Sequence, residues 1–93
     1  MKVTVVGLGL IGGSLAIDLR KTGLATELVG VDASAAHGER AVELKIVDRI
    51  ADEHSAFTSA DLVIFAIPIN LLAGKLPQVL DSIGKHTVVM DVG

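Results

Sequence analysis

The chain has 93 residues, a length typical of one domain, and it contains no cysteine, which excludes disulfides and thiolate metal sites. Its 8 Lys and Arg residues against 11 Asp and Glu give a net charge of −3. Because the basic residues are also scattered, neither nucleic acid nor an anionic membrane is expected as a partner.

The first predicted element is a strand over residues 2–6 that leads into a glycine-rich loop. The loop has the pattern Gly-x-Gly-x-x-Gly over residues 7–12, directly after a β-branched run. Gly7 permits a tight turn, Gly9 lets the backbone approach a pyrophosphate, and Gly12 brings a helix against the strand. Free N–H groups in the first turn of that helix, with its dipole, would then hold both phosphates without a cation.

A helix is predicted to follow the loop. Ile11, Leu15 and Leu19 recur at a spacing of four residues, with small residues beside them for close packing on a sheet. Gly23 is suited to the left-handed position that ends a helix. Lys2 before this apolar stretch could also suggest a signal peptide, but the glycines and the missing cleavage site argue against it. We therefore expect a cytoplasmic protein.

The run over residues 28–31 predicts a second strand, and it ends at Asp32, 20 positions after Gly12. A carboxylate at this position accepts hydrogen bonds from both hydroxyls of an adenosine ribose and repels a 2′-phosphate. The expected cofactor is thus NAD rather than NADP, with Arg40 as the cation that could complicate the preference. The alternative is a flexible turn followed by an ordinary loop acid.

The rest of the chain continues the alternation of helices and strands. Ser34 is a suitable N-cap for a helix to about Leu44, weakened by Gly38, and a short strand is predicted near residues 49–51. The apolar run over residues 62–67, closed by Pro68, predicts a strand buried on both faces. Further helical turns are predicted from Asn70 and from Pro77 to Gly84, before a last strand over residues 87–92.

This order of elements predicts an α/β fold, a Rossmann-type doubly wound parallel sheet of about five strands in the order 3-2-1-4-5. Residues 1–93 would form one dinucleotide-binding domain. A last strand that is apolar on both faces needs a cover, so we expect a further part of a longer protein, or another chain, to supply it.

The segment over residues 9–16, Asp32, the segment over residues 61–69 and the segment over residues 88–93 together resemble the prephenate dehydrogenase family of tyrosine biosynthesis. The resemblance implies a domain that binds NAD or NADP, and a helical C-terminal domain, absent from this chain, that forms a homodimer and much of the substrate pocket. It implies oxidative decarboxylation of prephenate to 4-hydroxyphenylpyruvate, with hydride passing to the nicotinamide. Arogenate dehydrogenases look similar, so prephenate and arogenate both remain possible substrates.

The resemblance also assigns the residues that bind the cofactor. The pyrophosphate would lie against Gly7, Gly9, Leu10, Ile11 and Gly12. The adenosine ribose would be held by Asp32 and Ser34, and the adenine or nicotinamide-ribose side by Ala66, Ile67 and Pro68.

The family's catalytic groups are missing from this sequence. Its histidine lies in a later His-Pro motif, its serine follows the Asp-x-Gly that here is residues 91–93, and its substrate arginine lies in the helical domain. His37 in a helix, His54 in a polar loop and His86 in a turn are not followed by proline and are expected to be surface residues.

Asp91, at the end of a strand, is the one candidate for a catalytic role, although an acid bonded to nearby backbone is an equal interpretation. We expect no catalysis from this chain alone and no metal. A regulatory module that senses NAD without doing chemistry is the alternative function.

Overall fold

The computed structural model describes residues 1–32, 34–51, 53–58, 60–67 and 87–91. The predicted helical turns from Asn70 and from Pro77 to Gly84 lie outside the described residues, as do Pro68 and His86. None of the helices in the described part of the chain has the length and hydropathy needed to cross a lipid bilayer.

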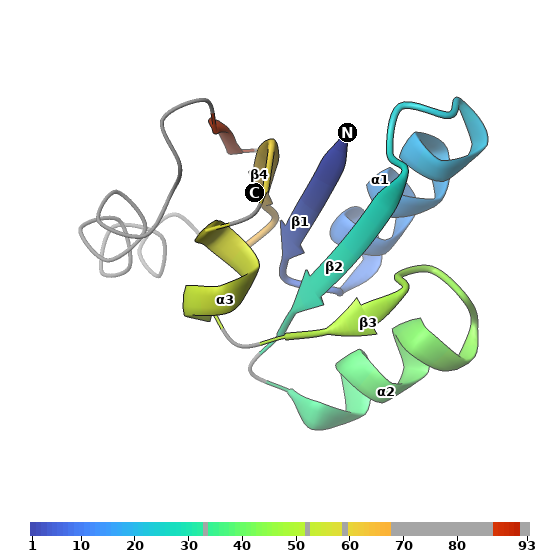
Figure 1. Cartoon of the computed structure of the whole chain (residues 1–93). Helices are drawn as coiled ribbons and strands as arrows, with labels where there is room; N and C mark the ends of the chain where they lie inside the picture. Colours follow the sequence, from blue (N-terminus) through green and yellow to red (C-terminus); the bar gives the residue numbers. More distant parts are fainter. Residues whose placement is uncertain (33, 52, 59, 68–86, 92–93) are drawn as a thin grey trace.

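Five parallel strands form one sheet in the order β3-β2-β1-β4-β5, which confirms the predicted Rossmann-type topology (Figure 1). The strands are β1 (Lys2–Val6), β2 (Glu27–Val31), β3 (Arg49–Ile50), β4 (Leu62–Phe65) and β5 (Val88–Asp91). In the register of the sheet, Val6 lies beside Val31 on one side and Phe65 on the other. The carboxyl ends of β1, β2 and β4 therefore meet at one edge.

Helices cover both faces of the sheet. The helices α1 (Leu10–Lys21) and α2 (Ala35–Glu43) pack on one face, and α3 (Glu53–Thr58) packs on the opposite face (Figure 1). The first face buries a cluster formed by Val3, Val5, Leu8, Ala16, Leu28, Ala41, Val47 and Ile64. The second buries Val6, Val29, Val31, Ala56, Phe57, Ala60, Val63 and Phe65. Alternate residues of β1 thus face different helices, as expected for a sheet covered on both sides.

Helix α1 ends as predicted and packs on the sheet with the predicted face, except at Ile11. Gly23 follows its last turn with a φ of +78°, the left-handed conformation expected there. Leu15 and Leu19 pack against the core, but Ile11 is 56% exposed, so its predicted burial is wrong. The reason is that Ile11 lies in the first turn, next to the loop that follows β1, while Gly12 and Ala16 face inward.

The loop predicted around His54 is also wrong, because residues Glu53–Thr58 form helix α3. Ala56 and Phe57 of this helix are buried against the sheet. The buried hydroxyl of Thr4 in β1 donates a hydrogen bond of 2.7 Å to the carbonyl oxygen of Ala56. Packing on the sheet therefore stabilises a helix that is too short to form by itself.

Candidate functional site

The carboxyl edge of the sheet gathers the predicted site residues. Gly7 follows β1, Asp32 follows β2, Ala66 follows β4, and Asp91 ends β5 opposite Phe65. The chain leaves β1 toward β2 and β3 and returns on the other side as β4, so the topology reverses between β1 and β4. Open α/β sheets bind ligands in the crevice at this reversal point.

The glycine loop has the tight geometry that its sequence predicts. Gly7 has a φ of +93° and donates a hydrogen bond of 2.7 Å to the carbonyl oxygen of Val31. A Cβ on Gly7 would lie 2.6 Å from the carbonyl oxygen of Ala66, and a Cβ on Gly12 would overlap the carbonyl oxygen of Gly7. These two glycines therefore permit the turn and the close contact between α1 and the strand.

Gly9 differs, because open space surrounds it. It is exposed and precedes α1 with an extended backbone (φ −75°, ψ −159°), and a Cβ placed on it would have no neighbour within 4 Å. No side chain caps this end of α1, and its first turn carries no acidic residue. The N–H groups of the first turn, which begins at Leu10 and Ile11, are thus suited to an anion.

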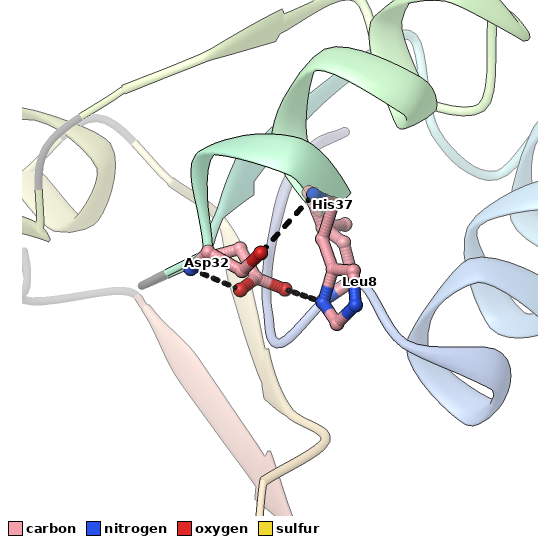
Figure 2. A network of polar contacts seen from close by, with 4 residues as sticks. Leu8, Asp32 and His37 are labelled. Atoms are coloured by element: carbon pink, nitrogen blue, oxygen red, sulfur yellow. Dashed lines mark hydrogen bonds and ion pairs between the residues drawn. The ribbon is translucent and has the colours of Figure 1, made fainter.

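Asp32 is tied to the glycine loop by its side chain, which is only 10% exposed. Its Oδ2 accepts a hydrogen bond of 2.7 Å from the backbone N–H of Leu8, and its Oδ1 accepts one of 2.8 Å from that of Ser34 (Figure 2). An ionised carboxylate has about four acceptor positions. Two backbone donors therefore leave capacity on both oxygens for further donors.

A residue that the sequence did not indicate contacts this carboxylate. Nδ1 of His37 lies 3.4 Å from Oδ2 of Asp32, and the imidazole is 59% exposed (Figure 2). The predicted surface position of His37 is correct, but its contact with the acid was not foreseen. The signal available in the sequence is the N-cap: since Ser34 begins α2, the third helical residue lies in the first turn beside the end of β2.

The other predicted residues take up different positions around the edge. The hydroxyl of Ser34 caps α2 by accepting a bond of 3.4 Å from the N–H of His37. Ala66 donates its N–H to the carbonyl oxygen of Val6 at 2.8 Å, and Ile67 packs against the core. For Asp91 the structure gives the position at the end of β5.

Gly30, in the middle of β2, also shapes the site. A Cβ on Gly30 would lie 2.6 Å from Cδ1 of Leu8 and 3.0 Å from Cδ1 of Ile50. The absence of that side chain allows Leu8 to pack under the glycine loop, where its N–H reaches Asp32. A glycine inside a predicted strand is a recognised sign of close approach by another segment.

A second acid, Asp48, lies at the opposite edge of the sheet, near the amino end of β2. The backbone N–H of Leu28, which donates a hydrogen bond of 2.8 Å to its carboxylate, lowers the pKa of Asp48, partial burial opposes this, and Arg20 lowers it further. The role of this acid is therefore to bond the start of β2 and not to bind a ligand. Among the residues that the structure describes, no group of three or more acids and histidines could hold a metal ion.

A groove lies outside the crevice, between α2 and β3. Its lining combines apolar and charged residues and includes Asp32 and Ser34. The residues that line it are Asp32, Ser34, Ala35, Gly38, Glu39, Val42, Glu43, Asp48, Arg49 and Ile50. It does not include the glycine loop.

Comparison with known proteins points to one family. The family model "Prephenate dehydrogenase, nucleotide-binding domain" matches residues 15–93. A prephenate dehydrogenase from Bacillus subtilis (strain 168) is 34% identical over 97 residues, an alignment that covers 100% of this chain and 26% of the relative. The chain thus spans about a quarter of the length of this curated relative.

Solved structures agree with this result. An arogenate dehydrogenase from Synechocystis has a TM-score of 0.89 and 38% identity, over 100% of this chain and 33% of that one. A prephenate dehydrogenase from A. aeolicus, in complex with hydroxyphenyl propionate and NAD⁺, has a TM-score of 0.88 and 26% identity. That match covers 98% of this chain and 33% of the other.

Proposed function

The chain belongs to the prephenate dehydrogenase family, and we propose that it binds NAD and forms the cofactor-binding part of an enzyme that oxidises prephenate. One observation carries this proposal. The side chain of Asp32, which is 10% exposed, is held beside the glycine loop, while none of the described residues fills the space over Gly9. A ribose diol and a pyrophosphate, which occur together in a dinucleotide, fit these two features by their chemistry.

The described residues fit a nicotinamide dinucleotide by their chemistry. The first turn of α1, at Leu10, Ile11 and Gly12, offers N–H groups to the pyrophosphate, with Gly7 and Gly9 shaping the loop. Asp32 offers acceptors to the ribose hydroxyls, and Ser34 lies next to them. When bound, NAD accepts a hydride from the substrate, and the protein orients it for that step.

We propose that the adenine or nicotinamide-ribose side of the cofactor is bound by Ala66, Ile67 and Pro68. Ala66 and Ile67 support this because they follow β4 at the point where the topology reverses. Asp91 ends the neighbouring strand and remains a candidate for contact with substrate.

The second candidate function is oxidation of arogenate. It is favoured by the arogenate dehydrogenase from Synechocystis, which is 38% identical to this chain. Both functions share the cofactor site. None of the described residues of that site distinguishes the two substrates. The homodimer, the helical substrate domain, the place in tyrosine biosynthesis and the cytoplasmic location stay predictions.

The test is a calorimetric titration of the chain with NAD and with NADP. We expect NAD to bind at least about tenfold more tightly, because Asp32 accepts from a diol and repels a phosphate. In the double variant Asp32→Ser, Ala33→Arg the gap should narrow or reverse. Equal or tighter binding of NADP by the unaltered chain would contradict the proposal.

A further inference from the structure

We propose that His37 is a specificity-determining residue, whose charge sets how strongly the site discriminates against a ribose that carries a 2′-phosphate. The inference rests on the proposed function, since it takes Asp32 as the residue that binds the adenosine ribose. It concerns a residue outside the dinucleotide fingerprint.

The geometry places the imidazole on the solvent side of the acid. Nδ1 of His37 lies 3.4 Å from Oδ2 of Asp32, and the imidazole is 59% exposed where the carboxylate is 10% exposed (Figure 2). The hydroxyl of Ser34 accepts a hydrogen bond from the N–H of His37, which holds the first turn of α2 in place. A ligand group that binds Asp32 therefore comes close to the imidazole as well.

The charged groups near His37 come from the end of β2 and from α2. Asp32 faces it from the end of β2, the loop over residues 7–9 is uncharged, and the first turn of α1 has no acid. Arg40 lies one turn further along α2. In the described part of the chain, His37 is the cationic group within ion-pairing distance of Asp32.

The two charge states of the imidazole have opposite consequences for the two cofactors. A protonated His37 pairs with Asp32, competes with ribose hydroxyls for its oxygens, and offers a charge-assisted donor to a 2′-phosphate. A neutral imidazole leaves the charge of Asp32 uncompensated, so that the phosphate is repelled. Because histidine changes charge between about pH 5 and pH 8, discrimination against NADP should be strongest above that range and weaker below it.

The experiment measures the dissociation constants of NAD and NADP at about pH 5.5 and about pH 8.5, values that bracket the titration of histidine. The proteins are the unaltered chain, His37→Gln and, as a matched control, Arg40→Gln. A phosphate monoester itself takes up a proton near about pH 6. The informative quantity is therefore the difference between His37→Gln and the unaltered chain, which cancels the titration of the ligand.

At the higher pH, which lies above the range in which histidines change charge, we expect the ratio of the two dissociation constants to be the same in both proteins within about twofold. At the lower pH the unaltered chain should favour NADP, relative to NAD, by about three- to fivefold more than His37→Gln does. Arg40→Gln controls for the titration of the phosphate: because arginine keeps its charge in this range, any change in its effect between the two pH values comes from the ligand.

Three outcomes would overturn the inference. If NAD binds and the ratio of the two dissociation constants is the same in His37→Gln and the unaltered chain at both pH values, the inference fails and the proposed function stands. If His37→Gln changes this ratio by the same factor at both pH values, His37 has only a structural effect. If the unaltered chain binds no NAD, both proposals fail. Circular dichroism checks that His37→Gln is folded, and His37→Asn provides a second neutral replacement.

Discussion

The three glycines of the loop have three different physical roles. Gly7 needs a positive φ, Gly12 lies against the carbonyl oxygen of Gly7, and Gly9 has ordinary extended backbone with open space around it. The first two roles concern the fold. The role of Gly9 concerns what approaches from outside, because none of the residues that the structure describes requires a glycine there.

Gly9→Val should therefore separate binding from folding. The new side chain would occupy the space over the loop, so we expect affinity for NAD to fall by at least about tenfold, while stability changes by no more than about 0.5 kcal/mol. Gly13→Ala is the matched control, since its Cβ also meets nothing and its N–H already bonds Gly9. Calorimetry and thermal unfolding measure the two effects. A folded Gly9→Val that binds NAD normally would show that the phosphates lie elsewhere.

Asp48 gives the fold a predictable dependence on pH. Its pKa is lowered in the folded chain, so the carboxylate stabilises the fold above the ordinary pKa of aspartate, about 3.9, and this contribution is lost as the pH falls through the lowered value. Asp48→Asn should thus lower the melting temperature at neutral pH, with a difference that shrinks in acid. A difference that stays constant from about pH 7 to about pH 3 would contradict this role.

At the scale of elements, strands were easier to predict than short helices. All five strands were predicted to within two residues at each end, and for β1, β2 and β4 the reason is that burial on both faces leaves a continuous apolar run. Helix α3 has six residues and no helical period. It forms because Ala56 and Phe57 pack on the sheet and Thr4 bonds its backbone, contacts that join residues about 50 positions apart.

Thr4→Val tests that account of α3. The substitution keeps the shape of the side chain but leaves the carbonyl oxygen of Ala56 without its buried donor, which should cost about 1–3 kcal/mol of unfolding free energy. Thr26→Val is the matched control, because the hydroxyl of Thr26 bonds the carbonyl of Met1 at an exposed site. Urea denaturation of both variants gives the comparison. Equal effects would show that the buried bond does not stabilise α3.

At the scale of the whole molecule, the order of the strands brings the site together. Gly7, Asp32 and Ala66 are far apart in sequence and adjacent at the carboxyl edge, where the topology reverses. The fingerprint made Gly7 and Asp32 predictable, because its spacing is local to one βαβ unit. The contacts of Asp32 with Leu8 and His37 were not predictable, since they depend on how Leu8 packs beneath Gly30 and on where α2 begins.

The central claim is that NAD lies along this edge, with its pyrophosphate on the glycine loop and its ribose on Asp32. The most direct test follows the backbone amide signals of the ¹⁵N-labelled chain by NMR during titration with NAD. The largest shifts are expected at residues 8–13 and at Ser34, with smaller ones at Ala66 and Ile67. Shifts centred on the groove between α2 and β3, at Val42 and Ile50, or at the opposite edge near Asp48 would contradict the claim.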